Sequence, residues 1–332
     1  MATSAFPATH PATSQDQELP VETPRFAPGL LRYPNLTTTV PKELVHRAAV
    51  AEVMLTDWER VDETRFKVAA QWPRGHSFFT PIDGRYHDPL IAAETIRQVG
   101  SLLGHAEFGV PFGHHYLLHD LSLRVHPEHM LIHQTPASLD LDVTCQDVKM
   151  RGGRLAALRY EAVVRRDGHT AATGLFSFSC VSPAVYRRVR PAHVFRSDHR
   201  PLPLTAPAAP QSVGRMSPAD VVLSPVGEPN RWQLRLDTQH PVLFDHPGDH
   251  VPGMVLLEAA RQAAAGALGR TSLFPLDLTS ELLQYAELDI PCLIEADPLP
   301  PQADGRRAVH VTGRQQGALV FSCTVTAAAH TG

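Results

Sequence analysis

The sequence predicts an α+β protein made of two copies of one unit, each a long buried helix wrapped by a curled antiparallel sheet. The first observation is a stretch at 252–268 that is rich in Ala and Leu and holds only three polar side chains. Because this stretch is apolar nearly all round, its helix is expected to be enclosed by protein. The second is that 76–99 can be laid over 240–263 without a gap. The third is that short alternating segments, typical of strands, follow each of these two stretches.

The overlay of the two stretches matches polar residues and glycine in one register. The coincidences are His76 with His240, Gly84 with Gly248, Glu94 with Glu258, Arg97 with Arg261, and Gln98 with Gln262. Each run of alternating segments also contains two cysteines. We therefore interpret the chain as a tandem duplication of a unit of roughly 140 residues. One long helix inside one curled sheet is the hot-dog architecture, and two such units are expected to form a double hot dog whose sheets join edge to edge.

Changes in composition mark the limits of the two units. Pro, Ser, Thr and Ala dominate the first residues, and a second Pro-rich region follows the first run of strands. The basic run at 186–190 within that region is interpreted mainly as a solvated face. The predicted division is a flexible N-terminal arm at 1–38, a first hot-dog unit at 39–183, a linker at 184–216 and a second hot-dog unit at 217–330.

Composition and charge narrow the class of function. A net charge of −4 gives no electrostatic reason to expect nucleic acid or an anionic membrane as a partner. The sequence has neither a signal-peptide pattern nor an apolar run of membrane-spanning length, so a cytoplasmic protein is expected. The four cysteines lack metal-ligand spacing. His246 and His250 have the spacing of two metal ligands on a helix, but the Pro and Gly between them disfavour a helix there. Neither a metal nor another cofactor is expected.

The polar residues of the 252–268 helix are the first site candidates. Glu258, Arg261 and Gln262 share one helical face, and charge on a buried helix is costly unless it is paired or functional. Apolar neighbours are expected to raise the pKa of Glu258, so that it could serve as a general base. Arg261 could bind a phosphate, or it could only neutralise a carboxylate. Backbone N–H groups near Gly253, at the helix start, suit a developing oxyanion.

The turn before this helix resembles a known family. The sequence DHPGDHVPGM at 245–254, followed by LEAARQ at 257–262, resembles the signature of the A-factor synthase family of actinobacterial γ-butyrolactone biosynthesis. The segment VPKELVHR at 40–47 is similar to that family too, so the resemblance covers about 40–330. It implies transfer of a β-ketoacyl group from acyl carrier protein to a hydroxyl of dihydroxyacetone phosphate, the first step toward a γ-butyrolactone or butenolide signal.

Two alternatives remain open. Dehydratases of the same fold carry His-x-Pro-Gly, whereas 246–248 lacks the intervening residue, so a β-hydroxyacyl carrier protein dehydratase or a thioesterase is the second hypothesis. A non-catalytic acyl-binding module is the third. The catalytic candidates are Glu258, His246, His250 and Glu94. The substrate-binding candidates are Arg261, Gln262, Gly248, Gly253, Arg97, Gln98 and Asp249.

The two units are expected to contribute unequally. Asp and His residues fill the turn at 245–250, whereas the matching residues at 81–86 share only the glycine. The chemistry is therefore expected to centre on Glu258, with Glu94 and Arg97 in a supporting pocket. Each pocket is expected between the helix of one unit and the turn of the other, so that Glu94 faces His246 or His250.

Overall fold

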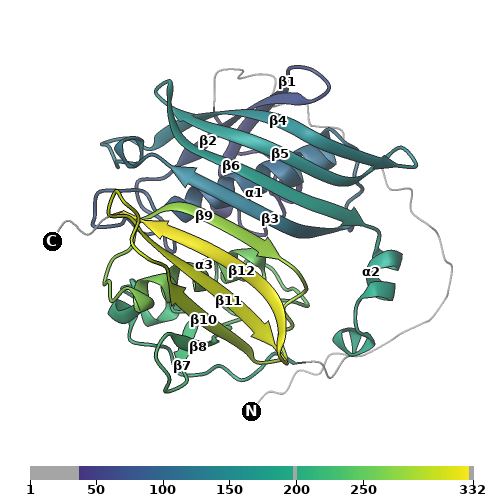
Figure 1. Cartoon of the computed structure of the whole chain (residues 1–332). Coiled ribbons are helices and arrows are strands. Elements are labelled where there is room, and N and C mark those ends of the chain that lie inside the picture. The colour runs from purple at the N-terminus through teal and green to yellow at the C-terminus, as the bar shows by residue number, and fades with distance from the viewer. Residues whose placement is uncertain (1–36, 197–199, 329–332) are drawn as a thin grey trace, which may run out of the picture. The chain divides into compact units, whose positions relative to one another are not determined.

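Residues 37–196 and 200–328, which the computed structural model describes, contain two helix-and-sheet units whose strands form one twelve-stranded antiparallel sheet (Figure 1). The predicted N-terminal arm lies almost entirely outside the described residues. None of the described helices is long and apolar enough to span a membrane. The four cysteines are buried and unpaired.

Each unit has two opening strands, one long helix and four further strands. The first unit comprises β1 (Leu55–Arg60), β2 (Arg65–Trp72), α1 (Pro89–Ala106), β3 (His115–Val125), β4 (Ala137–Arg151), β5 (Arg154–Arg166) and β6 (His169–Val181). The second comprises β7 (Leu223–Pro225), β8 (Arg231–Leu234), α3 (Gly253–Ala267), β9 (Pro275–Leu282), β10 (Cys292–Pro298), β11 (Arg307–Gln315) and β12 (Ala318–Ala327). Short 3₁₀ turns precede both opening hairpins, at Lys42–Val45 and Val50–Glu52 and at Pro210–Val213 and Pro218–Asp220.

Local sequence explains where the long helices begin and how the strands face. The Asp88 carboxylate accepts a hydrogen bond from the Leu90 N–H and Pro89 fills the first turn, so α1 begins with a complete cap. Burial alternates along most of β4, with the apolar residues buried and the polar ones exposed. Helix α1 packs on β3, β5 and β6, and α3 packs on β10, β11 and β12, so each helix lies on the apolar face of its own strands.

The two halves join through the pairing of β3 with β9. The strand order is β1-β2-β4-β5-β6-β3-β9-β12-β11-β10-β8-β7, and Leu121 lies opposite Ser280 at the junction. Strand pairing satisfies the edge that a single unit would leave open. The predicted double hot dog with edge-to-edge sheets is confirmed.

The Pro-rich region is more ordered than the sequence suggested. It contains α2 (Pro183–Val189) and a 3₁₀ turn at Ala192–Phe195, and Figure 1 shows α2 just beyond the end of β6. The turn at Pro210–Val213 packs on α3. The basic run is only partly a solvated face, because Tyr186 and Arg190 are buried.

Candidate functional site

Glu258 is fully buried and is held by two arginines. Arg261 Nε donates to Oε2 at 3.0 Å, and Arg215 Nε donates to Oε1 at 2.8 Å. Burial alone would raise the pKa of Glu258, but the charges of Arg215 and Arg261 and their hydrogen bonds lower it to about 2. The expectation of a raised pKa is therefore wrong. It included no charge from Arg215, which lies 43 residues from Glu258 in sequence. Glu258 is an ionised carboxylate with occupied oxygens and is poorly suited to act as a base.

Arg261 and Gln262 also have their polar groups engaged within the protein. The Arg261 side chain is only 2% exposed, and its guanidinium donates hydrogen bonds to Glu258 and to the Gly214 carbonyl. The Gln262 amide accepts from the Val222 N–H at 3.0 Å and donates to the Asp220 carbonyl at 2.7 Å. The geometry therefore assigns both side chains to joining α3 to the chain segment before β7.

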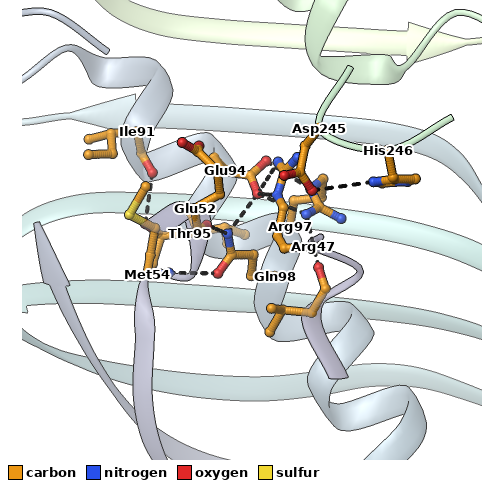
Figure 2. A network of polar contacts seen from close by, with 12 residues as sticks. Arg47, Glu52, Met54, Ile91, Glu94, Thr95, Arg97, Gln98, Asp245 and His246 are labelled. Atoms are coloured by element: carbon orange, nitrogen blue, oxygen red, sulfur yellow. Dashed lines mark hydrogen bonds and ion pairs between the residues drawn. The ribbon is translucent and has the colours of Figure 1, made fainter. Parts of the chain in front are cut away.

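Glu94 on α1 has equivalent partners (Figure 2). Arg97 donates to both of its oxygens at 2.8 Å, and Arg47 Nε donates at 3.0 Å. Burial alone would raise the pKa of Glu94, but these two arginines lower it to about 2. Gln98 accepts from the Met54 N–H at 2.9 Å and donates to a backbone carbonyl, as its counterpart in α3 does. The polar groups of Glu94 and Gln98 are thus hydrogen-bonded within the protein.

The two glutamates and their arginines, here called the Glu94 cluster and the Glu258 cluster, differ in exposure. The Arg97 side chain is 20% exposed and lines a cavity, whereas the Arg261 side chain is buried. That cavity measures about 430 Å³ and draws its walls from both units. Its polar lining includes His46, Arg47, Arg97, Ser101, His115, Tyr186, Asp245, His246 and His250, and its apolar lining includes Leu117, Leu118, Phe176, Phe178, Leu243, Met254 and Leu282. The cavity therefore lies between α1 of one unit and the turn of the other, beside the Glu94 cluster rather than the Glu258 cluster.

Asp245 anchors the turn to the opposite unit. Its carboxylate accepts hydrogen bonds from the Ala48 N–H at 2.5 Å and the Ala49 N–H at 3.0 Å. His246 Nδ1 lies 3.5 Å from the same carboxylate, and the His246 side chain is 53% exposed. Glu94 contacts neither His246 nor His250 through a hydrogen bond or ion pair in the described residues, and Figure 2 shows the arginines on the side of Glu94 toward Asp245 and His246.

Asp249 and His250 form a second pair, of which His250 lines the cavity. His250 Nδ1 lies 2.7 Å from Asp249 Oδ1. Burial alone would raise the pKa of Asp249, but hydrogen bonds from His250 and Tyr186 lower it below its ordinary value. An ionised carboxylate only accepts, so Nδ1 carries the hydrogen and Nε2 of the neutral ring keeps a lone pair. His250 is thus an oriented proton acceptor on the cavity wall.

The glycines of the turn differ in their steric need. A Cβ at Gly253 would lie 2.9 Å from Leu118 Cδ2, so glycine lets the start of α3 approach β3 closely. A Cβ at Gly248 would meet only the His250 carbonyl, at 3.7 Å. Pro252 supplies no side-chain cap, and Gly253 and Met254 line the cavity. The first N–H groups of α3 are therefore available to a negatively charged atom in the cavity.

The second partners of the two glutamates, Arg47 and Arg215, are not predicted by the sequence pattern. A signal was present, because Val45-His46-Arg47 and Val213-Gly214-Arg215 share a V-x-R pattern. It falls out of the register of the two helices, and so the overlay did not align it. Within residues 37–196 and 200–328, no group of three or more His, Cys, Asp or Glu side chains is arranged to hold a metal ion.

Comparison with known proteins places the chain in a family. Residues 32–182 and 197–331 each match the model of the AfsA family, described as the A-factor biosynthesis hotdog domain. A Streptomyces virginiae protein named 2-oxo-3-(phosphooxy)propyl 3-oxoalkanoate synthase is 56% identical over 87% of this chain and 98% of its own length. A Streptomyces coelicolor protein of the same name is 42% identical over 88% and 93%. A solved structure described as an oleoyl thioesterase of Lactobacillus plantarum shares the fold, with a TM-score of 0.50 at 10% identity over 82% of this chain and 99% of that one.

Proposed function

Because the chain belongs to the A-factor biosynthesis hotdog family, we propose that it is an acyltransferase that makes a 2-oxo-3-(phosphooxy)propyl 3-oxoalkanoate. In this reaction a 3-oxoacyl group leaves a thioester and joins the free hydroxyl of dihydroxyacetone phosphate. We infer that acyl carrier protein is the acyl donor and that the ester is a precursor of a γ-butyrolactone or butenolide signal. The observation that carries the proposal is that His250, oriented by Asp249, lines a largely apolar cavity in a chain so similar to named synthases.

His250 would act as the general base. Its Nε2 takes the hydroxyl proton of dihydroxyacetone phosphate while the hydroxyl oxygen attacks the thioester carbonyl carbon. The oxygen of the tetrahedral intermediate carries negative charge, which the N–H groups of Gly253 and Met254 would stabilise. Collapse of the intermediate breaks the C–S bond, and the imidazolium returns the proton to the leaving thiolate. The products are the ester and the free carrier thiol.

Arg97, in the Glu94 cluster, would bind the phosphate of the acceptor. Arg97 lines the cavity and uses Nε and Nη2 on Glu94, so its Nη1 would be the nitrogen that binds the phosphate. Glu94 would therefore hold Arg97 in place rather than exchange protons with substrate. Leu118, Phe178 and Leu243 offer an apolar surface for the acyl chain.

Product analysis by mass spectrometry tests the proposal. The purified protein is mixed with a β-ketoacyl carrier protein, with and without dihydroxyacetone phosphate. We expect a phosphorylated 3-oxoalkanoate ester and free carrier thiol that appear only when the acceptor is present. An enoyl carrier protein, formed from a β-hydroxyacyl carrier protein in a parallel reaction, would identify a dehydratase. A free acid would identify a thioesterase, and unchanged reactants would identify a binding module.

A further inference from the structure

Helix α2 places Tyr186 directly against the Asp249–His250 pair. The Tyr186 phenol donates to Asp249 Oδ1 at 2.7 Å and lies 2.9 Å from Oδ2. Its ring stacks on His115 of β3, with centroids 3.5 Å apart and planes inclined by 4°. Tyr186 is only 2% exposed and lines the cavity. The hydrogen bond to Asp249 and the stacking on His115 thus hold the phenol beside the carboxylate that orients His250.

Arg190, the residue after α2, fixes this helix to the second unit. Its guanidinium is buried and pairs with Glu287, with Nη2 donating to Oε2 at 2.8 Å. Nη2 also donates to the Asp249 carbonyl at 3.1 Å, and the guanidinium lies 4.1 Å from the centre of the Tyr285 ring. A buried arginine with a carboxylate partner and an aromatic face resists displacement. The position of Tyr186 is therefore set by contacts independent of its own hydroxyl.

We propose that Tyr186 is a positioning residue that holds Asp249 in the orientation in which Asp249 selects the Nδ1–H tautomer of His250. The catalytic consequence rests on the function proposed above, whereas the tautomer does not. Asp249 Oδ1 receives both the phenol and the His250 ring, so the phenol limits rotation of the carboxylate away from the imidazole. Without it, the carboxylate can turn toward Arg190, whose Nε already lies 3.8 Å from Oδ2.

The test is Tyr186→Phe in the full chain, read in two ways. In the acyl-transfer assay, kcat/KM should fall roughly 10- to 100-fold, as expected for a hydrogen bond to a charged group. In ¹⁵N NMR of histidine-labelled protein, the His250 signals, assigned by their absence from His250→Gln, should change from Nδ1–H alone to a mixture of tautomers. The NMR readout does not require turnover, so it remains decisive even if the protein makes no ester.

Ser177→Ala is the matched control. Ser177 donates its hydroxyl to Asp120, so the variant also removes a hydroxyl donor from an aspartate. Its neighbours Phe176 and Phe178 line the cavity, which places Ser177 on the opposite face of β6. We expect this variant to keep the wild-type kcat/KM and the wild-type His250 signals. A Tyr186→Phe protein that melts earlier but keeps both would show a purely structural role and overturn the proposal.

Discussion

His250→Gln should lower kcat for acyl transfer by roughly 10²- to 10⁴-fold, the usual loss when a positioned general base is removed. Glutamine keeps a polar side chain of similar size but has no ring nitrogen that can accept and return a proton. His250 is one-third exposed, so the variant is expected to fold. Release of carrier thiol, measured per folded molecule, gives kcat, and a thermal melt gives the stability.

His246→Gln is the matched comparison for this prediction. His246 lines the same cavity, but its side chain is 53% exposed and lies 3.5 Å from the Asp245 carboxylate. Because that carboxylate is engaged by backbone N–H groups, it orients the His246 ring less firmly than Asp249 orients His250. The loss at His246 should therefore be the smaller one. Equal losses at both histidines, or a larger one at His246, would contradict the assignment of His250 as the base.

Glu258→Gln should reduce the free energy of unfolding by about 3–5 kcal/mol, because it leaves Arg215 and Arg261 buried without their anion. The molecules that remain folded should keep near wild-type kcat, since Glu258 does not line the cavity. Urea denaturation and turnover per folded molecule measure the two effects. A variant as stable as wild type but inactive would restore Glu258 as the catalytic base.

The same substitution should change acid stability. The pKa of Glu258 falls from 4.5 to about 2 on folding. A lowered folded-state pKa contributes stability that is fully present above pH 4.5 and is lost as the pH falls toward 2. Wild-type protein should lose this contribution across that window, and Glu258→Gln should lack it. Glu228→Gln removes the same charge from an exposed ion pair with Arg231. This variant should change neither the free energy of unfolding nor its loss in acid measurably.

Much of the fold could be predicted from residue patterns alone. The apolar stretches that hold Glu94 and Glu258 predicted both long helices, and the match between them predicted the duplication. Those signals are local or repeat in a constant register. The pairing of each glutamate with a second arginine is different, because Arg47 and Arg215 reach the helices only after the chain has folded back. Without them, burial suggested the wrong direction for the pKa of Glu258.

The site was harder to predict than the fold. The acids and histidines of the turn predict Asp249 and His250 as candidates, but Tyr186 lies in a basic run that is typical of a solvated surface. Its burial depends on tertiary contacts with His115 and the turn. The expected weighting of the two helices also changes, because the cavity lies beside Arg97 on α1 while its counterpart on α3 is sealed.

A crystal structure of the protein with a non-reactive 3-oxoacyl thioester analogue and dihydroxyacetone phosphate would test the central claim most directly. We predict the acyl chain against Leu118 and Phe178, the phosphate on Arg97, and the acceptor hydroxyl within roughly 2.6–3.2 Å of His250 Nε2. Ligands bound against Glu258, or an acceptor hydroxyl remote from His250, would contradict the account.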